Sequence, residues 1–234
     1  MSAPLSGRSV VVTNAATDLG RAVCVGLGRA GARVTAQIDG RQVAAAQLVA
    51  DAVAAFGCLD GFVNCHNLTP QMCGSAESLT LDAFMAGISR NLSEPFFGCQ
   101  AAAAQMLDQV CPHATPNHRG NIVNITSVAA VLALPGHATF CSAMAGLDVA
   151  TRILAAEWGP RGIRVTAVGA GLSTDVLAGV LPAGTSARRV PQRAVVAPEQ
   201  VAEAVCFLLG DAAGGVAGST LYVDGGWLAN GYWE

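Results

Sequence analysis

The chain has 234 residues, of which 52% are hydrophobic and 12% are charged, so it can bury the core of one domain. A net charge of −3 without a basic stripe argues against nucleic-acid binding. No apolar stretch reaches the roughly 18 residues that a membrane span needs, and no basic segment followed by an apolar one opens the sequence. We therefore expect a cytoplasmic protein that binds neither nucleic acid nor membrane.

Lysine, tyrosine and cysteine are distributed unusually. All thirteen basic side chains are arginine, so the chain contains no lysine, and its two tyrosines are Tyr222 and Tyr232. A mutational bias toward arginine codons would explain the missing lysine, unless a particular position needs one. The eight cysteines are scattered without paired spacing, which favours reduced, mostly buried thiols over a disulfide framework.

In chain order, the hydrophobic pattern alternates between strands and helices. Short β-branched runs predict strands over residues 9–13, 33–38, 59–63, 121–126, 163–168 and 220–223. Helical spacing predicts helices over 19–30, 42–56, two segments of 81–108, most of 136–158, and 198–209. Strands separated by helices imply a single α/β domain over 1–234, with a doubly wound parallel sheet of six strands.

A series of short motifs runs nearly from end to end. They are Val10-Val11-Val12-Thr13 with Leu19-Gly20, Phe56-Gly57-Cys58-Leu59-Asp60, Asn64, Asn91-Leu92, Ile122-Val123-Asn124-Ile125-Thr126-Ser127, Ala145-Gly146-Leu147, Trp158-Gly159-Pro160-Arg161-Gly162-Ile163-Arg164-Val165, and Tyr222-Val223-Asp224-Gly225-Gly226. In combination they resemble the classical short-chain dehydrogenase/reductase family. The resemblance implies one Rossmann-like domain that oxidises an alcohol or reduces a ketone with NAD(P). The segment between Gly31 and Phe56 is much shorter than in that family, which implies that the family's third strand and its helix are missing.

The family's cofactor turn, Thr-Gly-x-x-x-Gly-x-Gly, is altered between Thr13 and Gly20. Gly20 is retained, but Asn14 and Asp18 stand where the family has glycine. Asn14 can keep the turn because asparagine tolerates positive φ. We expect Asp18 to cap the first helix, with its carboxylate taking the amides and the positive dipole end that otherwise bind pyrophosphate. A plain N-cap without that role is the alternative interpretation.

The adenosine side of the expected cofactor site is altered as well. Ile38 stands where the family has the residue that selects NAD or NADP, and Asp39 lies one place late, on the other face of a strand. The family's Asn-Asn-Ala-Gly becomes Asn64-Cys65-His66-Asn67. We therefore expect this chain to bind no dinucleotide in the usual pose. The vestigial cofactor positions are Asn14, Asp18, Gly20, Ile38 and Asn64.

Two of the family's four catalytic side chains are missing. Asn91 and Ser127 match the family's Asn and Ser, whereas Phe140 and Met144 stand where its Tyr and Lys belong. In the family the Tyr exchanges a proton with the substrate oxygen and the Lys lowers the pKa of that Tyr. Phenylalanine has no proton to exchange, and methionine has neither charge nor donor. The resemblance therefore implies no catalytic residue in this chain.

Other polar and aromatic residues have plainer interpretations. His137 could serve as a substitute base, but a hydrogen-bonded structural role is the stronger interpretation. Cys111, His113 and His118 lie in one long loop, and their spacing matches no zinc motif, so no metal site is predicted. The resemblance places a mobile substrate lid over 172–196, with Thr174 one residue early. The tail carries Trp227, Tyr232 and Trp233, which fit either a subunit contact or packing onto the chain's own core.

Three functions are compatible with these residues. The first is a pseudoenzyme subunit that pairs with an active paralogue in a hetero-oligomer, through the helices over 93–108 and 136–158 and the last strand. The family resemblance implies a heterotetramer. NAD would then bind in the partner, as in heteromeric dehydrogenases where a shorter inactive companion supports a subunit that oxidises an acyl-CoA alcohol. The second is an enzyme with altered chemistry through Ser127, His137 or Cys141. The third is a ligand-sensing regulatory protein.

Overall fold

The protein, seen here in a computed structural model, contains one parallel sheet of six strands in the order β2-β1-β3-β4-β5-β6. The structure describes residues 3–36, 44–65, 74–115, 117–171 and 190–230. The strands are β1 (Ser9–Val12), β2 (Arg33–Ala36), β3 (Gly61–Asn64), β4 (Gly120–Ser127), β5 (Ile163–Ala170) and β6 (Thr220–Val223). Every pairing is parallel, which confirms the predicted doubly wound sheet. Among the described residues, β2 lies at one edge of the sheet, which has the six strands predicted.

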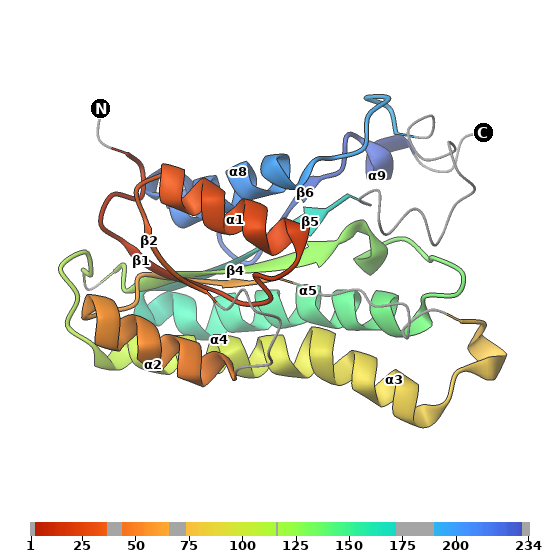
Figure 1. The fold of residues 1–234 in the computed structure, drawn as a ribbon, viewed down its shortest axis with the longest axis horizontal. Helices are drawn as coiled ribbons and strands as arrows, with labels where there is room; N and C mark the ends of the chain where they lie inside the picture. The colour runs from red at the N-terminus through yellow and green to blue at the C-terminus, as the bar shows by residue number, and fades with distance from the viewer. Residues whose placement is uncertain (1–2, 37–43, 66–73, 116, 172–189, 231–234) are drawn as a thin grey trace.

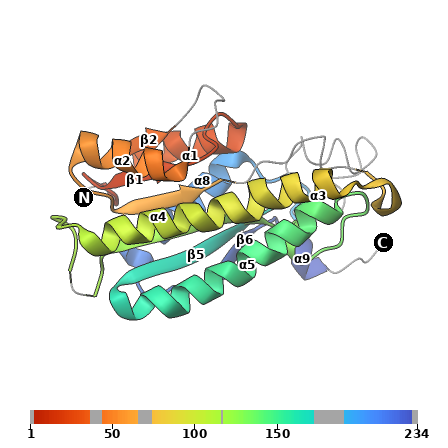
Figure 2. The same cartoon turned by 90° about the horizontal axis from the view of Figure 1, so that it is seen from below.

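Helices cover both faces of the sheet (Figure 1). The helices α1 (Asp18–Arg29) and α8 (Pro198–Leu209) lie on one face. The other face carries α2 (Ala45–Phe56), α4 (Glu94–Asp108) and α5 (Ala138–Trp158), which run side by side in Figure 2. The short helix α9 (Trp227–Asn230) follows β6.

The two faces bury two separate hydrophobic clusters because side chains alternate along each strand. In β1, Val10 and Val12 belong to the cluster beneath α1 and α8, whereas Val11 belongs to the cluster beneath α2 and α4. Both clusters consist mainly of aliphatic side chains that are almost fully buried, and the second also contains Phe62. This near-continuous hydrophobic character is typical of parallel strands that are covered on both sides.

The predicted strand over 59–63 is shifted by the structure. It begins at Gly61 and includes Asn64, because hydrogen bonds to a side chain hold the backbone of Leu59. The Leu59 amide donates to Gln109 Oε1 at 2.9 Å, and Gln109 Nε2 donates to the Leu59 carbonyl at 2.6 Å. The helix α2 begins at Ala45 rather than 42. Residues 37–43, including the expected end of the second strand, lie outside the described residues.

The region 81–108 forms two helices, as predicted, and a π-helical turn joins them. The helix α3 (Leu81–Ile88) passes into a turn labelled η3 (Ser89–Ser93), and α4 follows at once. Turns of this kind are uncommon and occur often at functional sites. By length and hydropathy the segment Ala138–Arg161 could also cross a membrane, but in this fold it is the helix α5 and its end, lying against the sheet.

Candidate active site

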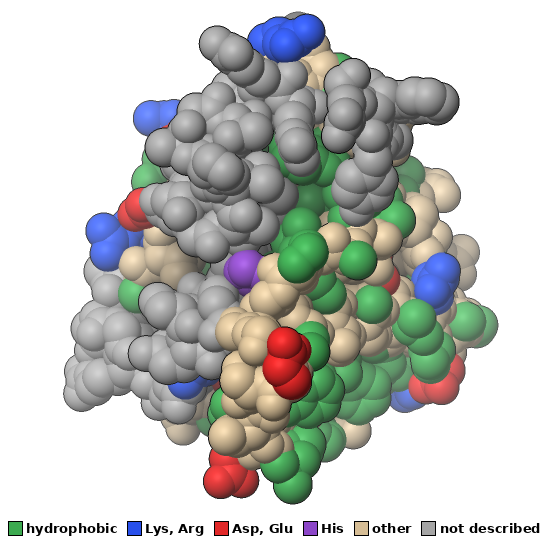
Figure 3. Space-filling model, turned by 90° about the vertical axis from the view of Figure 1, so that its right-hand side faces the viewer, with side chains coloured by type: hydrophobic (Ala, Val, Ile, Leu, Met, Phe, Trp, Pro, Cys, Tyr) green, Lys and Arg blue, Asp and Glu red, His purple; other side chains and the backbone are tan. Residues whose placement is uncertain are grey.

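The carboxyl ends of the strands meet at one end of the molecule, where α/β sheets usually hold their ligands. Figure 3 views this end, and hydrophobic side chains outnumber charged ones on the visible described surface. The turn between β1 and α1, the end of β4 and the start of α5 all lie here. These three segments carry most of the residues that the sequence singled out.

Asn14 preserves the turn after β1 in the manner predicted. Its φ is 50°, in the left-handed region, and its Nδ2 donates to the Cys65 carbonyl at the end of β3 at 2.6 Å. Gly20 is retained for a steric reason: a Cβ there would lie 2.4 Å from the carbonyl oxygen of Asn14. The turn therefore has one glycine at the three positions where the resemblance places glycine.

The prediction that Asp18 caps α1 is wrong. Thr17 is the N-cap residue, and its Oγ1 accepts a hydrogen bond from the Gly20 amide at 3.0 Å. Asp18 is instead the first residue of the helix, with an exposed side chain. A threonine and an aspartate are both good caps, so the sequence alone did not distinguish them. The carboxylate still adds negative charge to the first turn, where the helix dipole is positive.

Asn91 and Ser127 are both buried. Asn91 lies in the turn η3 with 0% of its surface exposed, and its Nδ2 donates to the Gly87 carbonyl at 3.3 Å. Ser127 ends β4 and caps a short 3-10 turn, η4 (Val128–Ala130), through a 3.2 Å hydrogen bond from the Ala129 amide to its Oγ. The helix α5 packs against both turns, so the fold brings these segments together.

Phe140 and Met144 are core residues. Their exposed fractions are 1% and 0%, and with Ala129 they form a small apolar cluster against Leu134 and Cys141. One turn of α5 separates the two side chains, as the spacing predicted. An apolar cluster therefore occupies the segment where the resemblance places a phenol and an ammonium.

The candidate substitutes at the start of α5 are held in structural positions. His137 is 3% exposed, precedes α5 as its N-cap residue, and has its Nδ1 3.0 Å from the Pro135 carbonyl oxygen. Cys141 is half-buried in the first turn of the helix. Ser127 Oγ accepts from the Ala129 amide, whereas His137 Nδ1 lies against the Pro135 carbonyl.

Asn64, predicted as a vestigial cofactor residue, belongs instead to a buried polar network. Its Nδ2 donates to Asn124 Oδ1 at 2.8 Å and to the Pro95 carbonyl at 3.0 Å. Asn124 Nδ2 donates to Thr151 Oγ1 at 2.9 Å, and that hydroxyl donates to the Leu147 carbonyl. The network therefore joins β3, β4, α4 and α5. The sequence contained these residues, but nothing in their spacing indicated that they meet.

Tyr222 also has a structural role. Its hydroxyl donates to Asp148 Oδ2 at 3.3 Å, while Thr220 Oγ1 donates to Asp148 Oδ1 at 3.1 Å. Burial and the negative charge of Asp148 raise the pKa of Tyr222 to about 12. This phenol therefore stays protonated at neutral pH. It borders a hollow of about 390 Å³ between α5 and β6 that also contains Arg152.

Several predicted positions lie outside the described residues. They are Ile38, Asp39, His66, Asn67, Thr174 with most of the expected lid, Tyr232 and Trp233. Trp227 is described: it is half-buried in α9 and packs with Val128 and Leu134. Its side chain therefore lies against the chain's own core.

Comparison with known proteins gives matches over almost the whole chain. The profile of a family described as enoyl-(acyl carrier protein) reductase matches residues 4–228. The D-threitol dehydrogenase of Mycolicibacterium smegmatis is 32% identical over 253 aligned residues, covering 95% of this chain and 94% of that protein. The 3beta-hydroxysteroid dehydrogenase 1 of Eggerthella lenta is 30% identical, with 95% and 94% coverage. Both alignments are longer than this chain, so these relatives contain residues that it lacks.

Solved structures show the same fold. A structure described as a short-chain alcohol dehydrogenase from Sinorhizobium meliloti 1021 superposes with a TM-score of 0.84 and 26% identity. The superposition covers 98% of this chain and 99% of the solved one. The architecture is therefore shared from end to end, including the elements around the candidate site.

Proposed function

The chain belongs to the short-chain dehydrogenase/reductase family, and we propose that within it the chain is a non-catalytic subunit that stabilises an active, NAD-dependent paralogue. The observation that carries this proposal is the apolar pair Phe140 and Met144, buried where the family has its Tyr and Lys. The relatives that match are named as dehydrogenases.

Among the described residues, no tyrosine or lysine other than Tyr222 is available to take over the missing proton transfer. The sequence contains no lysine at all. Of its two tyrosines, Tyr222 is described, and its hydroxyl donates a hydrogen bond to Asp148. Because its pKa is raised to about 12, its phenol exchanges protons poorly at neutral pH.

The turn after β1 does not fit the pyrophosphate of a dinucleotide. Phosphate binding at a helix N-terminus depends on unpaired amides and on the positive end of the dipole. Here Thr17 Oγ1 already takes the Gly20 amide, and the Asp18 carboxylate places a like charge in the first turn. We therefore derive no hydride transfer in this chain and assign NAD to the partner.

The helices α4 and α5 offer a surface for that partner. Phe97 on α4, and Val149 and Ile153 on α5, are 60%, 44% and 48% exposed, and the two helices lie side by side (Figure 2). The segment Ala138–Arg161 is apolar enough to span a membrane, yet its most apolar window is only 39% buried in this chain. Large exposed apolar patches mark interaction sites. This supports pairing through α4 and α5, with Leu221 of β6 as a further apolar contact.

The substrate of the complex would be selected by the partner's pocket. The lost Tyr and Lys and the shortened nucleotide half are similar to those of the inactive subunit of the heteromeric dehydrogenase in anaerobic toluene breakdown. That enzyme oxidises 2-[hydroxy(phenyl)methyl]succinyl-CoA to benzoylsuccinyl-CoA with NAD. We propose this reaction as the specific case, in the cytoplasm, and a heterotetramer as the assembly.

Co-expression tests the proposed function. The tagged chain is produced with a short-chain dehydrogenase from the same cell that retains Tyr-x-x-x-Lys, and the purified material is analysed by native mass spectrometry and NAD-linked alcohol oxidation. We expect a complex of defined stoichiometry that is active, and a single chain that is not. Phe97→Arg with Ile153→Arg should abolish the complex. Val25→Arg, on the opposite face and 51% exposed, should not.

Two results would contradict this account. One is a stable homo-oligomer that pairs with no such dehydrogenase. The other is NAD-linked alcohol oxidation by the purified single chain. If that activity were lost in His137→Ala, the chain would be an enzyme with altered chemistry instead.

A further inference from the structure

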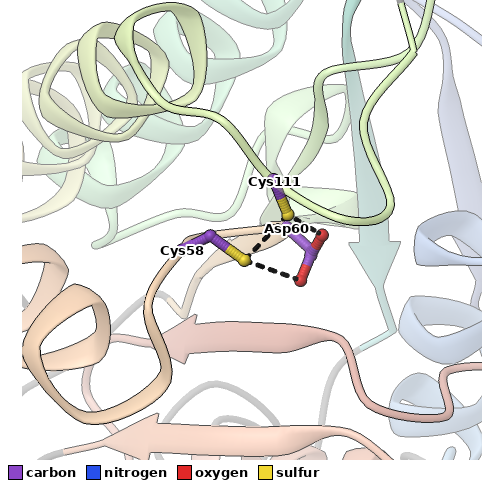
Figure 4. A group of neighbouring side chains, drawn as sticks. All are labelled: Cys58, Asp60 and Cys111. Carbon is purple, nitrogen blue, oxygen red and sulfur yellow. Dashed lines mark hydrogen bonds between the residues drawn. The ribbon is translucent and has the colours of Figure 1, made fainter.

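Three potential metal-binding side chains meet at the amino edge of the sheet, the end opposite Ser127 (Figure 4). Cys58 follows α2, Asp60 immediately precedes β3, and Cys111 lies in the loop after α4. Their sulfur and oxygen atoms all lie within 4.8 Å of one another. Their exposed fractions are 2%, 7% and 6%. The chain brings them together although 53 residues separate the two cysteines.

The contacts within this cluster are short and centre on Asp60. Cys111 Sγ lies 3.0 Å from Asp60 Oδ1 and 2.7 Å from Cys58 Sγ, and Cys58 Sγ lies 3.9 Å from Asp60 Oδ2. The Ser9 amide donates to Asp60 Oδ2 at 2.8 Å. No arginine forms a salt bridge with Asp60 in the described part of the chain. A buried carboxylate is thus held by one amide and by thiols, which are weak donors.

We propose that Cys58, Asp60 and Cys111 bind a thiophilic divalent cation of the Zn²⁺ class, with water as the fourth ligand. Two thiolates and a carboxylate are a ligand set that tetrahedral Zn²⁺ accepts. The cation supplies the positive charge that the buried carboxylate lacks. Binding releases the two thiol protons to solvent. The site does not depend on the proposed function.

The cluster fits a cation better than a disulfide. Oxidation of the two thiols would remove both S–H donors from Asp60 and leave its buried carboxylate with the Ser9 amide alone among the described contacts. Coordination instead gives the carboxylate a direct bond to the ion. Sulfurs that share a tetrahedral Zn²⁺ lie about 3.8 Å apart, given Zn–S distances of about 2.3 Å. Cys58 and Cys111 reach this separation by a shift of roughly 1 Å, which two loop residues can make.

The spacing of cysteine and histidine in the sequence did not predict this metal site. Burial, and then the neighbouring Asp60, raise the pKa of Cys111 to about 12, so without a cation the thiols remain protonated. His118, from the same loop, has its pKa lowered by burial and by Arg8 and Arg164. Neither His118 nor His113 belongs to the group of facing ligand atoms. The ligands come instead from three segments that are distant in sequence.

Cobalt titration of the full chain under oxygen-free, reducing conditions tests the site. We expect one equivalent of Co²⁺ to give a sulfur-to-cobalt band in the near ultraviolet and tetrahedral bands in the visible, which one equivalent of Zn²⁺ displaces. Cys58→Ser, Cys111→Ser and Asp60→Asn should weaken binding by more than the roughly 10–100-fold that loss of an outer-shell partner costs. Cys24→Ser, a half-buried thiol on α1, should bind like the parent chain.

Peptide mapping of the parent chain keeps the test decisive if a variant fails to fold. Cys58 and Cys111 should be alkylated more slowly with Zn²⁺ bound than after a chelator removes it, whereas the alkylation rates of the other buried thiols, such as Cys65 and Cys99, should not depend on Zn²⁺. The proposal is overturned if the folded parent chain gives no sulfur-to-cobalt band, or if Cys58→Ser keeps it. A Cys58–Cys111 disulfide that forms while Zn²⁺ is present would overturn it equally.

Discussion

The two halves of α5 have different characters. Its first half carries Phe140 and Met144 in an apolar cluster, whereas its second half carries Thr151, which accepts from Asn124 in the buried network. Every polar atom of that link is paired, so loss of one partner leaves another unsatisfied. In the first half, the side chains of Phe140 and Met144 add no polar group to the core that would need a partner. The polar network that joins the helices to the sheet therefore lies next to an apolar segment, at the positions where the resemblance places Tyr and Lys.

A charge placed in the first half of α5 should have the largest effect on the free energy of unfolding. Met144→Lys buries an ammonium at a position that is 0% exposed and lowers the free energy of unfolding by about 3–5 kcal/mol. Met144→Leu, which keeps the volume, should cost less than about 1.5 kcal/mol. Urea denaturation followed by circular dichroism measures both. Equal stability of the two variants would mean that the fold still accommodates a lysine at this position, which would contradict the apolar character of the first half of α5.

Loss of a hydrogen bond in the polar network at the second half of α5 should have the next largest effect on the free energy of unfolding. Asn124→Ala leaves the Asn64 amide without its best acceptor and the Thr151 hydroxyl without its donor. We expect a loss of about 2–3 kcal/mol in the free energy of unfolding.

Thr126 is the matched control on the same strand. Its hydroxyl is buried without a hydrogen-bond partner in the described chain, so Thr126→Val should be neutral or slightly stabilising. If both variants cost the same, packing rather than the polar network would hold this region together.

Substitutions in the turn after β1 should have a smaller effect on stability. They distinguish the hydrogen bond of the Thr17 cap from the charge of Asp18. Thr17→Ala removes the hydrogen bond to the Gly20 amide and should cost about 1 kcal/mol. Asp18→Ala removes a favourable charge near the dipole and should cost about 0.3–1 kcal/mol at low ionic strength. Thermal unfolding at low and high salt distinguishes them, because salt screens only the charge. A larger loss for Asp18→Ala at high salt would restore Asp18 as the cap.

Alkaline pH should reveal the smallest effect, at Tyr222. Its pKa is raised from 10 to about 12 in the folded chain, so the fold favours the protonated phenol. This contribution to stability is fully present below pH 10 and is lost as the pH rises through about 12. Denaturation at a series of pH values should show a steeper loss over this range in the parent chain than in Tyr222→Phe. Identical profiles would show that burial and Asp148 do not raise the pKa of Tyr222 in the folded chain.

The sequence predicted the fold well because the strands and helices carry strong local patterns. All six strands and the alternation with helices follow from apolar runs and from glycine and proline at the boundaries. The start of β3 was misplaced because Gln109, fifty residues away, holds Leu59. The side chain of a distant residue leaves no local signal in the strand that it ends.

The candidate site was predicted unevenly. Motif register located Asn91, Ser127, Phe140 and Met144, and the structure places their segments together. The choice between Thr17 and Asp18 as the cap depended on the residue at which the backbone changes from extended to helical. Both residue types are good caps, so the sequence did not decide between them. The cluster of Cys58, Asp60 and Cys111 could not be predicted, because its members are near in space only after β3 and the end of α4 have packed together.

Titration of the purified chain with NAD tests most directly whether the chain lacks the family's chemistry. The Asp18 carboxylate and the occupied Gly20 amide lead us to expect no heat of binding at micromolar chain and cofactor concentrations in isothermal calorimetry. An active short-chain dehydrogenase serves as the positive control. Saturable NAD binding with micromolar affinity would contradict the account of this chain as a supporting subunit.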